Sequence, residues 1–288
     1  MTTSAAVAAR IEQQPREAAP FLKWAGGKGR LLSQLRPLLP SGASRMRHVE
    51  PFVGGGALFF SRLPKRALLT DINPALIGTY TAIRDDVSGV IQALRGLAAR
   101  HSKDCYYEVR ERYNRSPRIT TAKRAAMFIY LNKTCFNGLH RVNRKGEFNV
   151  PIGSYKNPRI LNEDALNAAS QALQAAHLRC SSFEALLENA KPGDFVYFDP
   201  PYEPVSETAS FTSYTRDGFS REDQTRLRDV YSALDRRGCK LMLSNSDAPF
   251  IRKLYEGFHI DAVAAPRAIN CNASKRGKVS EVVVRNYS

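Results

Sequence analysis

Residues 48–62 read HVEPFVGGGALFFSR, an apolar stretch that passes through three glycines into a second apolar run. We predict a β-strand over His48–Val53 and a helix over Ala57–Arg62, with the glycine turn between them. Glycine lets the backbone approach a ligand closely where the N-terminus of a helix points outward. Because glycine turns after strands also serve packing alone, this junction indicates an α/β unit and only weakly a nucleotide-like ligand.

The same alternation of strand and helix continues along most of the chain. It favours an α/β fold with a mostly parallel sheet wrapped by helices. Apolar residues at three-to-four spacing predict helices over Pro74–Arg84 and Arg221–Asp235. The remaining expected strands are Ala67–Thr70, His177–Cys180, Phe195–Phe198, Cys239–Ser244, His259–Ala264 and Glu281–Val284.

This rhythm breaks after about Asp85. From there to about Arg159 the sequence is first helix-like and charged, then becomes CFNGLHRVNRKGEFNVPIGSYKNP over residues 135–158. Its Gly, Asn and Pro residues predict a long hairpin with basic tips. We therefore expect a catalytic domain made of residues 21–84 and 160–288, an insert over residues 85–159, and a loose leader over residues 1–20.

The net charge favours a polyanionic partner. Lys and Arg number 43 against 27 for Asp and Glu, which gives a formal charge of +16. A protein that neutralises phosphates releases condensed counterions, so such an excess suits nucleic acid. Charge alone also fits a merely soluble basic protein, but between Lys103 and Arg159 the basic residues far outnumber the acidic ones. We expect the insert to carry the nucleic-acid surface.

Several classes of protein are excluded by the sequence. The chain has no apolar run near the roughly 20 residues that cross a bilayer. Charged residues, among them Arg10 and Glu17, interrupt any signal-like stretch at the start. The five cysteines lack paired spacing, which argues against zinc and disulfides and predicts structural roles in a reducing, cytoplasmic setting. They are Cys105, Cys135, Cys180, Cys239 and Cys271.

An acidic residue ends the strand that follows the glycine turn. Asp71 lies in LLTDINP, residues 68–74, where a carboxylate can accept hydrogen bonds from both ribose hydroxyls of an adenosine moiety. The alternative is a helix N-cap, with Asp71 or Asn73 starting the helix at Pro74. With the glycine turn, this position predicts an adenosine-containing cofactor without separating NAD from S-adenosylmethionine.

A second glycine-rich segment lies upstream, in FLKWAGGKGRLL over residues 21–32. The sole tryptophan, Trp24, precedes Lys28 by four residues, a spacing that places both on one side of a helix N-terminus. A phosphate-binding loop is an alternative, but the full spacing with a terminal Lys-Ser/Thr is missing. Another is that Trp24 belongs to the core and Lys28 is a surface charge.

The strongest local signal is Asp199-Pro200-Pro201-Tyr202, directly after the strand Phe195–Phe198. Two prolines cannot continue a β-ladder and hold the backbone in one geometry. The exocyclic N6 of adenine is a poor nucleophile, and Asp199 with the Pro200 carbonyl can accept its two N–H groups. Tyr202 can stack on an extruded base. The alternative is a rigid turn with an aspartate cap.

Taken together and in order, these segments resemble the Dam family of DNA adenine-N6 methyltransferases. The matching pieces run from Phe21 to about Tyr202: FLKWAGGK, EPFVGGGALFF, LLTDINPALI, the 135–158 segment and YFDPPY. The resemblance implies a Rossmann-like methyltransferase sheet with helices on both faces, an inserted DNA-recognition domain, and S-adenosylmethionine as cofactor. It implies catalytic roles for Asp199, Pro200, Pro201 and Tyr202. It implies cofactor contacts for Trp24, Lys28, Phe52, Gly54, Asp71, Phe183 and Asp199.

The resemblance also implies duplex DNA as the partner and a set of residues that contact it. Phe136 and Asn137 resemble residues that wedge beside the extruded base. Arginine can bind guanine O6 and N7, and leucine can contact a thymine methyl group. We therefore expect GATC as the target, although position 136 is Phe where some relatives carry Tyr. The implied DNA-contacting set is Lys23, Phe136, Asn137, Leu139, Arg141, Asn143 and Pro151.

Other readings stay open at this point. Arg141 and Lys23 could hold only phosphates, and Phe136 could be a core residue. The same Asp-Pro-Pro-Tyr segment could serve methylation of cytosine N4, RNA adenine or a protein glutamine amide, although Asp at position 199 favours a nucleobase amine. A catalytically silent DNA-binding protein and an NAD-dependent oxidoreductase are the remaining alternatives; intact motifs argue against the first and the lack of a histidine proton donor against the second. We expect a monomer without metal, in a bacterial nucleoid or encoded by a phage.

Overall fold

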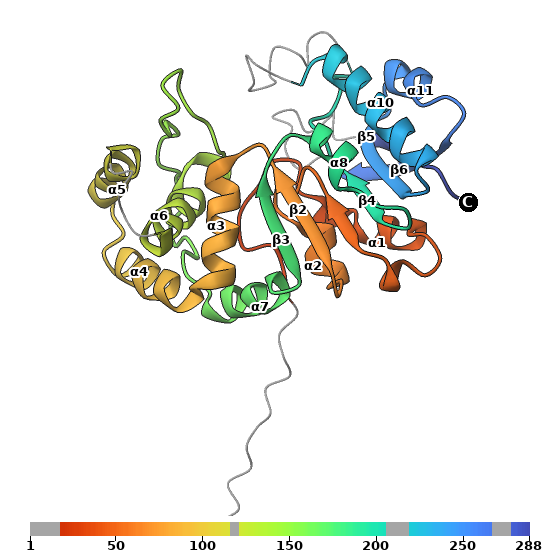
Figure 1. The fold of residues 1–288 in the computed structure, drawn as a ribbon. Helices are drawn as coiled ribbons and strands as arrows, with labels where there is room; N and C mark the ends of the chain where they lie inside the picture. The colour runs from red at the N-terminus through yellow and green to blue at the C-terminus, as the bar shows by residue number, and fades with distance from the viewer. Residues whose placement is uncertain (1–17, 116–120, 206–218, 267–277) are drawn as a thin grey trace, which may run out of the picture.

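The computed structural model describes residues 18–115, 121–205, 219–266 and 278–288. Within them, one seven-stranded sheet has the strand order β3-β2-β1-β4-β5-β7-β6 (Figure 1). The predicted leader lies outside the described residues up to residue 17. The strands are β1 His48–Glu50, β2 Ala67–Asp71, β3 Ala176–Cys180, β4 Phe195–Phe198, β5 Lys240–Ser246, β6 His259–Pro266 and β7 Lys278–Arg285.

The sheet is mostly parallel, as the alternation predicts. Neighbours from β3 through β5 pair in parallel, and β7 pairs antiparallel with both β5 and β6. Each predicted strand coincides with an observed one to within a few residues. The largest differences are three residues at one end of a strand: β7 begins at Lys278 rather than Glu281, and β1 ends at Glu50 rather than Val53, because Pro51 has no N–H to donate to a ladder.

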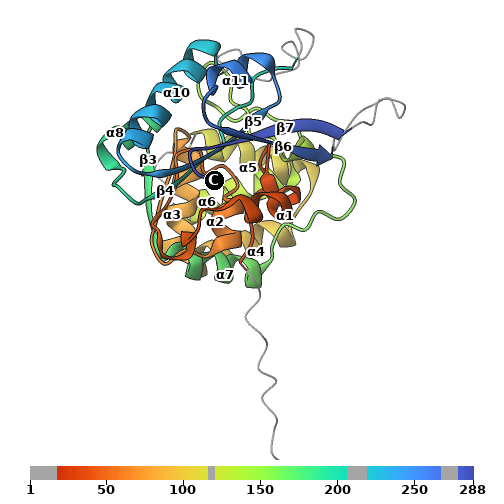
Figure 2. The same ribbon diagram turned by 90° about the vertical axis from the view of Figure 1, so that its right-hand side faces the viewer.

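Helices cover both faces of the sheet, which confirms the Rossmann-like fold. Neighbouring residues in a strand point to opposite faces. Phe195 and Tyr197 of β4 pack with α1 and α2, whereas Val196 and Phe198 pack with α8 and α10. Figure 2 shows the sheet between these layers, with α8, α10 and α11 on one side and α1, α2 and α3 on the other.

The helix bounds agree with the predicted ones to within one residue at α2, α3 and α10. The α-helices are α1 Leu32–Leu35, α2 Ala57–Arg62, α3 Pro74–Asp85, α4 Val87–Ala99, α5 Lys103–Arg115, α6 Thr121–Thr134, α7 Glu163–Leu173, α8 Leu186–Asn189, α10 Arg221–Arg236 and α11 Pro249–Leu254. Short 3-10 helices are Lys28–Arg30, Arg36–Leu38, Ala43–Arg45, Phe136–Gly138 and Phe183–Ala185. None of these helices is both long and apolar enough to span a membrane.

Helices α4, α5 and α6 occupy the predicted insert. They share one hydrophobic cluster with the sheet and its helices, since Val90 and Ile129 belong to the same cluster as Phe21, Val53 and Leu69. The buried residues of α6 run without interruption from Ala125 to Asn132, so this helix is covered on all sides. The helical part of the insert therefore packs as a continuation of the catalytic core.

The segment after α6 folds back on itself and rises above the insert's helices (Figure 1). The predicted hairpin is irregular, because its arms meet at two isolated bridges, Cys135–Ile152 and Val142–Phe148, instead of a continuous ladder. The Asn143 side chain accepts from the backbone N–H groups of Lys145 and Glu147 and so shapes the tip. Side-chain bonds of this kind compete with ladder pairing.

Candidate active site

The three motifs predicted from the sequence meet at one edge of the sheet. Strands β2, β1 and β4 are neighbours and parallel, so their carboxyl ends lie side by side. The glycine turn follows β1, Asp71 ends β2, and Asp199 follows β4. In open α/β sheets ligands bind at the carboxyl ends of the strands, where the strand order changes direction. This edge is the candidate active site.

Gly54 allows Trp24 to lie directly against the backbone. A Cβ atom at position 54 would lie 2.8 Å from Trp24 Cδ1, and Gly54 has a φ of +46°. The turn is fixed by two hydrogen bonds: Gly54 N donates to Asp71 Oδ2 at 3.1 Å, and the Tyr80 hydroxyl donates to the Gly54 carbonyl at 3.0 Å. The close approach predicted for this turn is made to a side chain of the protein itself.

Asp71 does not cap the helix that follows it. Asn73 is the N-cap of α3, because its side-chain oxygen accepts from the N–H groups of Ala75 and Leu76. Asp71 instead links the glycine turn after β1 to the start of α3. Its Oδ1 accepts from Asn73 N at 3.0 Å, and its Oδ2 accepts from Gly54 N. Burial raises the pKa of Asp71, and these backbone donors act in the opposite direction.

Trp24 and Lys28 do not share a helix as their spacing predicts. Trp24 lies in a turn closed by Gly27 N, and its ring stacks on His140 of the insert with centroids 5.8 Å apart. Lys28 begins a 3-10 helix and is 5% exposed, so the surface-charge alternative is wrong. Lys28 Nζ lies 2.7 Å from Asp199 Oδ1 and donates to the Gly26 carbonyl at 2.7 Å.

Asp199 is a mostly enclosed carboxylate, with 21% of its side chain exposed. Burial raises its pKa to about 6, while the Lys28 ammonium lowers it; Glu50 and Glu281 add to the rise. Apart from that ammonium, no donor among the described residues reaches Asp199 Oδ1. At neutral pH Asp199 is thus an ionised acceptor.

Tyr202 is held by a residue that the sequence motifs did not reveal. Its hydroxyl donates to Glu281 Oε2 of β7 at 2.7 Å, and Lys28 Nζ lies 4.6 Å from the centre of its ring. Burial raises the pKa of Tyr202, which keeps the hydroxyl protonated as a donor. The available sequence signal was the acidic residue that directly precedes the apolar residues 282–284.

A buried polar cluster fixes the backbone of the Asp-Pro-Pro-Tyr segment, residues 199–202, which we call the elbow. Gln224 Nε2 of α10 donates to the Pro201 carbonyl at 2.9 Å, and Asn245 Oδ1 of β5 accepts from Glu203 N at 3.0 Å. The Ser246 hydroxyl donates to the Glu203 carbonyl, and Asn245 Nδ2 donates to Gln224 Oε1. These residues were also missed, although the polar run Ser244–Ser246 at the end of an apolar strand was a signal.

Phe52 and Phe183 are two of the cofactor contacts that the resemblance implies. The structure brings them together, with ring centroids 5.6 Å apart and planes inclined by 28°. Phe219 packs on both rings. In this arrangement no planar ligand fits between Phe52 and Phe183, so the two rings offer one shared apolar surface.

The residues predicted to wedge into DNA lie at the start of the hairpin, next to Lys23. Phe136 is 45% exposed, so its assignment to the core is wrong. Asn137 is also exposed and has a φ of +53°. Lys23 Nζ donates to the Lys133 carbonyl at 3.1 Å and lies 3.8 Å from the centre of the Tyr155 ring.

The other predicted DNA contacts have structural bonds within the hairpin. Arg141 Nε donates to Asn149 Oδ1 at 2.7 Å, and Asn143 Nδ2 donates to Glu147 Oε2 at 2.8 Å. Leu139 is half-buried against the core, and the Pro151 carbonyl accepts from Phe136 N at 2.9 Å. A base contact by Arg141 would add to or replace its bond to Asn149.

No cluster of three or more metal-ligating side chains occurs among the described residues. Cys105, Cys135, Cys180 and Cys239 are free thiols there. Cys271 lies outside the described ranges.

The site combines three features at the carboxyl ends of a Rossmann-like sheet: a glycine turn, an acidic strand end and the Asp-Pro-Pro-Tyr segment. Together they define an amino-methyltransferase. Residues 24–269 match the family described as D12 class N6 adenine-specific DNA methyltransferase. The chain belongs to that family and is a DNA adenine-N6 methyltransferase. Membership implies a methyl donor, S-adenosylmethionine, and a DNA substrate.

Proteins with curated names support the assignment over nearly the whole chain. The type II methyltransferase M.MjaIII of Methanocaldococcus jannaschii is 46% identical, covering 94% of this chain and 100% of that protein. The type II methyltransferase M1.LlaDCHI of Lactococcus lactis subsp. cremoris is 43% identical, covering 93% and 95%. The DNA adenine methylase of Escherichia coli K12 is 37% identical, covering 91% and 93%. The similarity thus extends well beyond Tyr202.

Proposed function

We propose that the enzyme methylates an adenine within GATC after that base has been extruded from the duplex. The observation that carries the proposal is the acceptor at Asp199, enclosed and ionised, with a tyrosine fixed beside it. An exocyclic amine bears two N–H donors, and a base inside a duplex cannot bring them to an enclosed acceptor. The base must therefore leave the duplex before its amine can reach Asp199.

The residues at the edge fit S-adenosylmethionine, which supplies an electrophilic methyl group when bound. The ligand carries hydroxyls, an ammonium and a carboxylate, and this end of the sheet offers the Asp71 carboxylate at the glycine turn and the Lys28 ammonium beside Asp199. We assign cofactor contacts to Trp24, Lys28, Gly54 and Asp71, with Phe52 and Phe183 as the apolar surface. Asp199 belongs to both the cofactor-binding and the catalytic set.

Asp199, Pro200 and Tyr202 would orient the amine. Asp199 accepts one N–H and the Pro200 carbonyl the other, which favours a pyramidal nitrogen with its lone pair available. Pro201 keeps the elbow rigid. Once the new C–N bond has formed, the nitrogen must lose a proton, and Asp199 can accept it. Tyr202 stacks on the base and limits its rotation.

Recognition of GATC would come from the hairpin and Lys23. The exposed Phe136 and Asn137 would wedge beside the extruded base. Arg141 and Leu139 have the side chains that read guanine and the thymine methyl group in the major groove. Lys23 would reach a flanking guanine, and Asn143 and Pro151 would complete the DNA-contacting set.

The test is methyl transfer from tritiated S-adenosylmethionine to duplexes that contain GATC or a scrambled site. Asp199→Ala should lose activity by at least about a thousandfold, whereas Asp229→Ala, on the exposed side of α10, should retain it. Sequencing of modified bases gives the target site directly. Methylation outside GATC would overturn the specificity, and an active Asp199→Ala enzyme would overturn the catalytic assignment. Replacing the target adenine by 2-aminopurine tests extrusion, since its fluorescence rises when the base unstacks.

A further inference from the structure

The opposite edge of the sheet has a hollow of its own. Its volume is about 590 Å³, and it is lined by residues that directly precede β1, β2, β3 and β4, among them Arg47, Arg66, Ala175 and Asp194. A second hollow of about 470 Å³ adjoins it and shares Arg45, Met46 and Arg66. We call the two together the amino-edge hollow. It faces away from Asp199, because it lies at the other end of the same strands.

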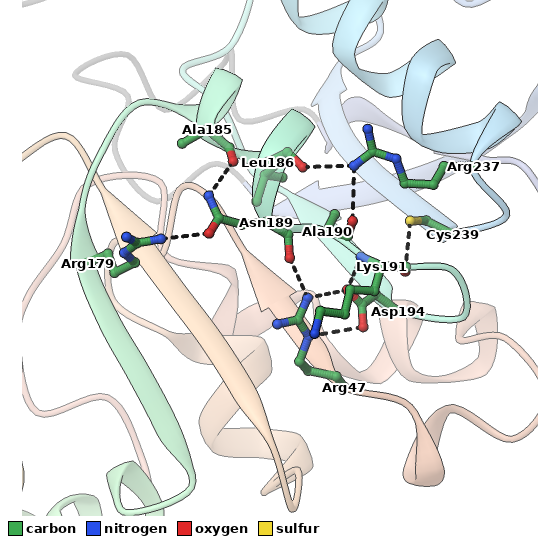
Figure 3. Close-up of polar contacts among 10 residues, drawn as sticks. All are labelled: Arg47, Arg179, Ala185, Leu186, Asn189, Ala190, Lys191, Asp194, Arg237 and Cys239. Carbon is green, nitrogen blue, oxygen red and sulfur yellow. Dashed lines mark hydrogen bonds and ion pairs between the residues drawn. The ribbon is translucent and has the colours of Figure 1, made fainter.

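An ion pair between Arg47 and Asp194 forms part of the lining of the amino-edge hollow and carries no net charge. Arg47 Nε donates to Asp194 Oδ1 at 3.0 Å, and a second contact joins Arg47 Nη2 to Asp194 Oδ2. Arg47 also donates to the Asn189 carbonyl at 2.7 Å, and Lys191 N donates to Asp194 Oδ2 at 2.7 Å (Figure 3). Asp194 is therefore fully used by its own surroundings and does not offset the charge of the rim.

The rim is cationic. Arg45, Lys65, Arg66 and Lys191 are exposed, and no ion pair or side-chain hydrogen bond engages them within the described residues. Guanidinium and ammonium groups around a concave surface bind phosphate oxygens. The lining contains no Phe, Tyr or Trp on which a nucleobase could stack. These features suit a ligand recognised by its phosphates alone.

We propose that the amino-edge hollow is a second, sequence-independent DNA-binding site, which takes backbone phosphates of a duplex segment other than the one being methylated. Long, exposed side chains spread over two adjoining hollows fit an extended polyanion better than a small enclosed anion. A straight duplex bound at the carboxyl edge cannot reach them, because the strands of the sheet lie between. The enzyme's own substrate is a polyanion of this chemistry.

The test uses full-length enzyme with one equivalent of an unlabelled 12-base-pair GATC duplex and S-adenosylhomocysteine. A fluorescein-labelled duplex without GATC is then titrated, and its anisotropy is followed from 50 to 200 mM salt. We expect the labelled duplex to bind. For Arg45→Glu/Arg66→Glu, binding should weaken about tenfold or more, and the slope of log K against log salt should become shallower by about 2, as for two lost phosphate contacts.

Matched variants separate the hollow from general charge. Lys191→Glu should weaken binding of the labelled duplex, whereas Lys253→Glu, an equally exposed lysine on α11, should not. Methylation of the short GATC duplex, measured in parallel, should stay within about twofold in every variant, since the rim is remote from Asp199. Loss of that methylation in Arg45→Glu/Arg66→Glu would overturn the proposal, because the hollow would then not be separate from the methylation site.

The proposal is overturned if the wild-type complex takes up no labelled duplex, or if Arg45→Glu/Arg66→Glu binds it as wild type does. An arm with inorganic phosphate, followed by calorimetry, identifies a small-anion site. Binding of phosphate without binding of the labelled duplex would likewise overturn the DNA role.

Discussion

The hydrogen bond from Tyr202 to Glu281 joins the catalytic elbow to a strand 79 residues further along the chain. If it fixes the tyrosine ring, Glu281→Ala should lower kcat about tenfold, the effect of losing a hydrogen bond to a charged acceptor. Tyr202→Phe should lower kcat by a similar factor. The Km for S-adenosylmethionine should change little in either variant.

A double-mutant cycle gives this prediction its control. In the Tyr202→Phe background, Glu281→Ala should have almost no further effect, because the shared bond is already lost. Glu256→Ala, an exposed carboxylate after α11, should behave as wild type in both backgrounds. Additive losses would show that Glu281 acts by another route.

The raised pKa of Asp199 predicts a pH dependence of both activity and stability. As an acceptor Asp199 must be ionised, so kcat should fall as the pH drops through about 6. The folded protein holds the Asp199 proton more tightly than the unfolded chain does. Ionising Asp199 therefore lowers the free energy of unfolding as the pH rises from the ordinary pKa of an aspartate through about 6. The melting temperature of Asp199→Asn should therefore gain on that of wild type between pH 5 and pH 7.5. A pH-independent difference would contradict the assigned shift.

The close contact between Gly54 and Trp24 predicts the effect of adding a side chain at position 54. A methyl group at position 54 would strike the Trp24 ring at 2.8 Å, in a backbone conformation that alanine rarely adopts. Gly54→Ala should cost about 1–3 kcal/mol of unfolding free energy and weaken cofactor binding. Trp24 is the only tryptophan, so its fluorescence reports the displacement directly. Gly29→Ala, where a Cβ meets nothing within 4 Å, is the matched control.

Among the secondary-structure elements, α10 and β5 support the elbow through Gln224 and Asn245. Removing the Asn245 amide would leave the Glu203 N–H and Gln224 Oε1 without their partner in a buried cluster, at a cost of about 1–3 kcal/mol. Asn245→Ala should therefore lower the denaturant midpoint and reduce kcat by loosening Pro201. Asn167→Ala, on the exposed side of α7, should change neither. Full activity of Asn245→Ala would show that the two prolines alone hold the elbow.

The sequence predicts elements well where the signal is local. The strand-glycine-helix pattern at residues 48–62 located β1 and α2, and Pro74 with an Asx residue before it located α3. It failed where contacts distant in sequence decide the outcome. Asn73 rather than Asp71 caps α3 because Asp71 is drawn to Gly54, and the bond between Glu281 and Tyr202 has no local pattern. Trp24 stacks on His140, so its setting depends on the insert.

For the whole molecule, the predicted organisation separates residues 85–159 from a catalytic domain. Composition changes at these borders, but a change in composition does not show which surfaces a segment buries. In the structure α6 packs on α3 as well as on α4, and its buried residues belong to the cluster that contains Val53 and Leu69. The insert is thus distinct in sequence and continuous in packing.

This continuity predicts that residues 85–159 do not fold on their own. Excision would expose the side of α6 that contacts α3, and the core that α4, α5 and α6 form among themselves is small for offsetting the conformational entropy of a fragment of this size. The isolated fragment should show weak helical circular dichroism and no cooperative melt, whereas the same helices melt with the sheet in the full-length enzyme. The hairpin should be as protease-sensitive in the fragment as an unfolded chain. A cooperative transition in the fragment would mean that the insert carries a sufficient core of its own, and the shared cluster would then be an interface between two domains.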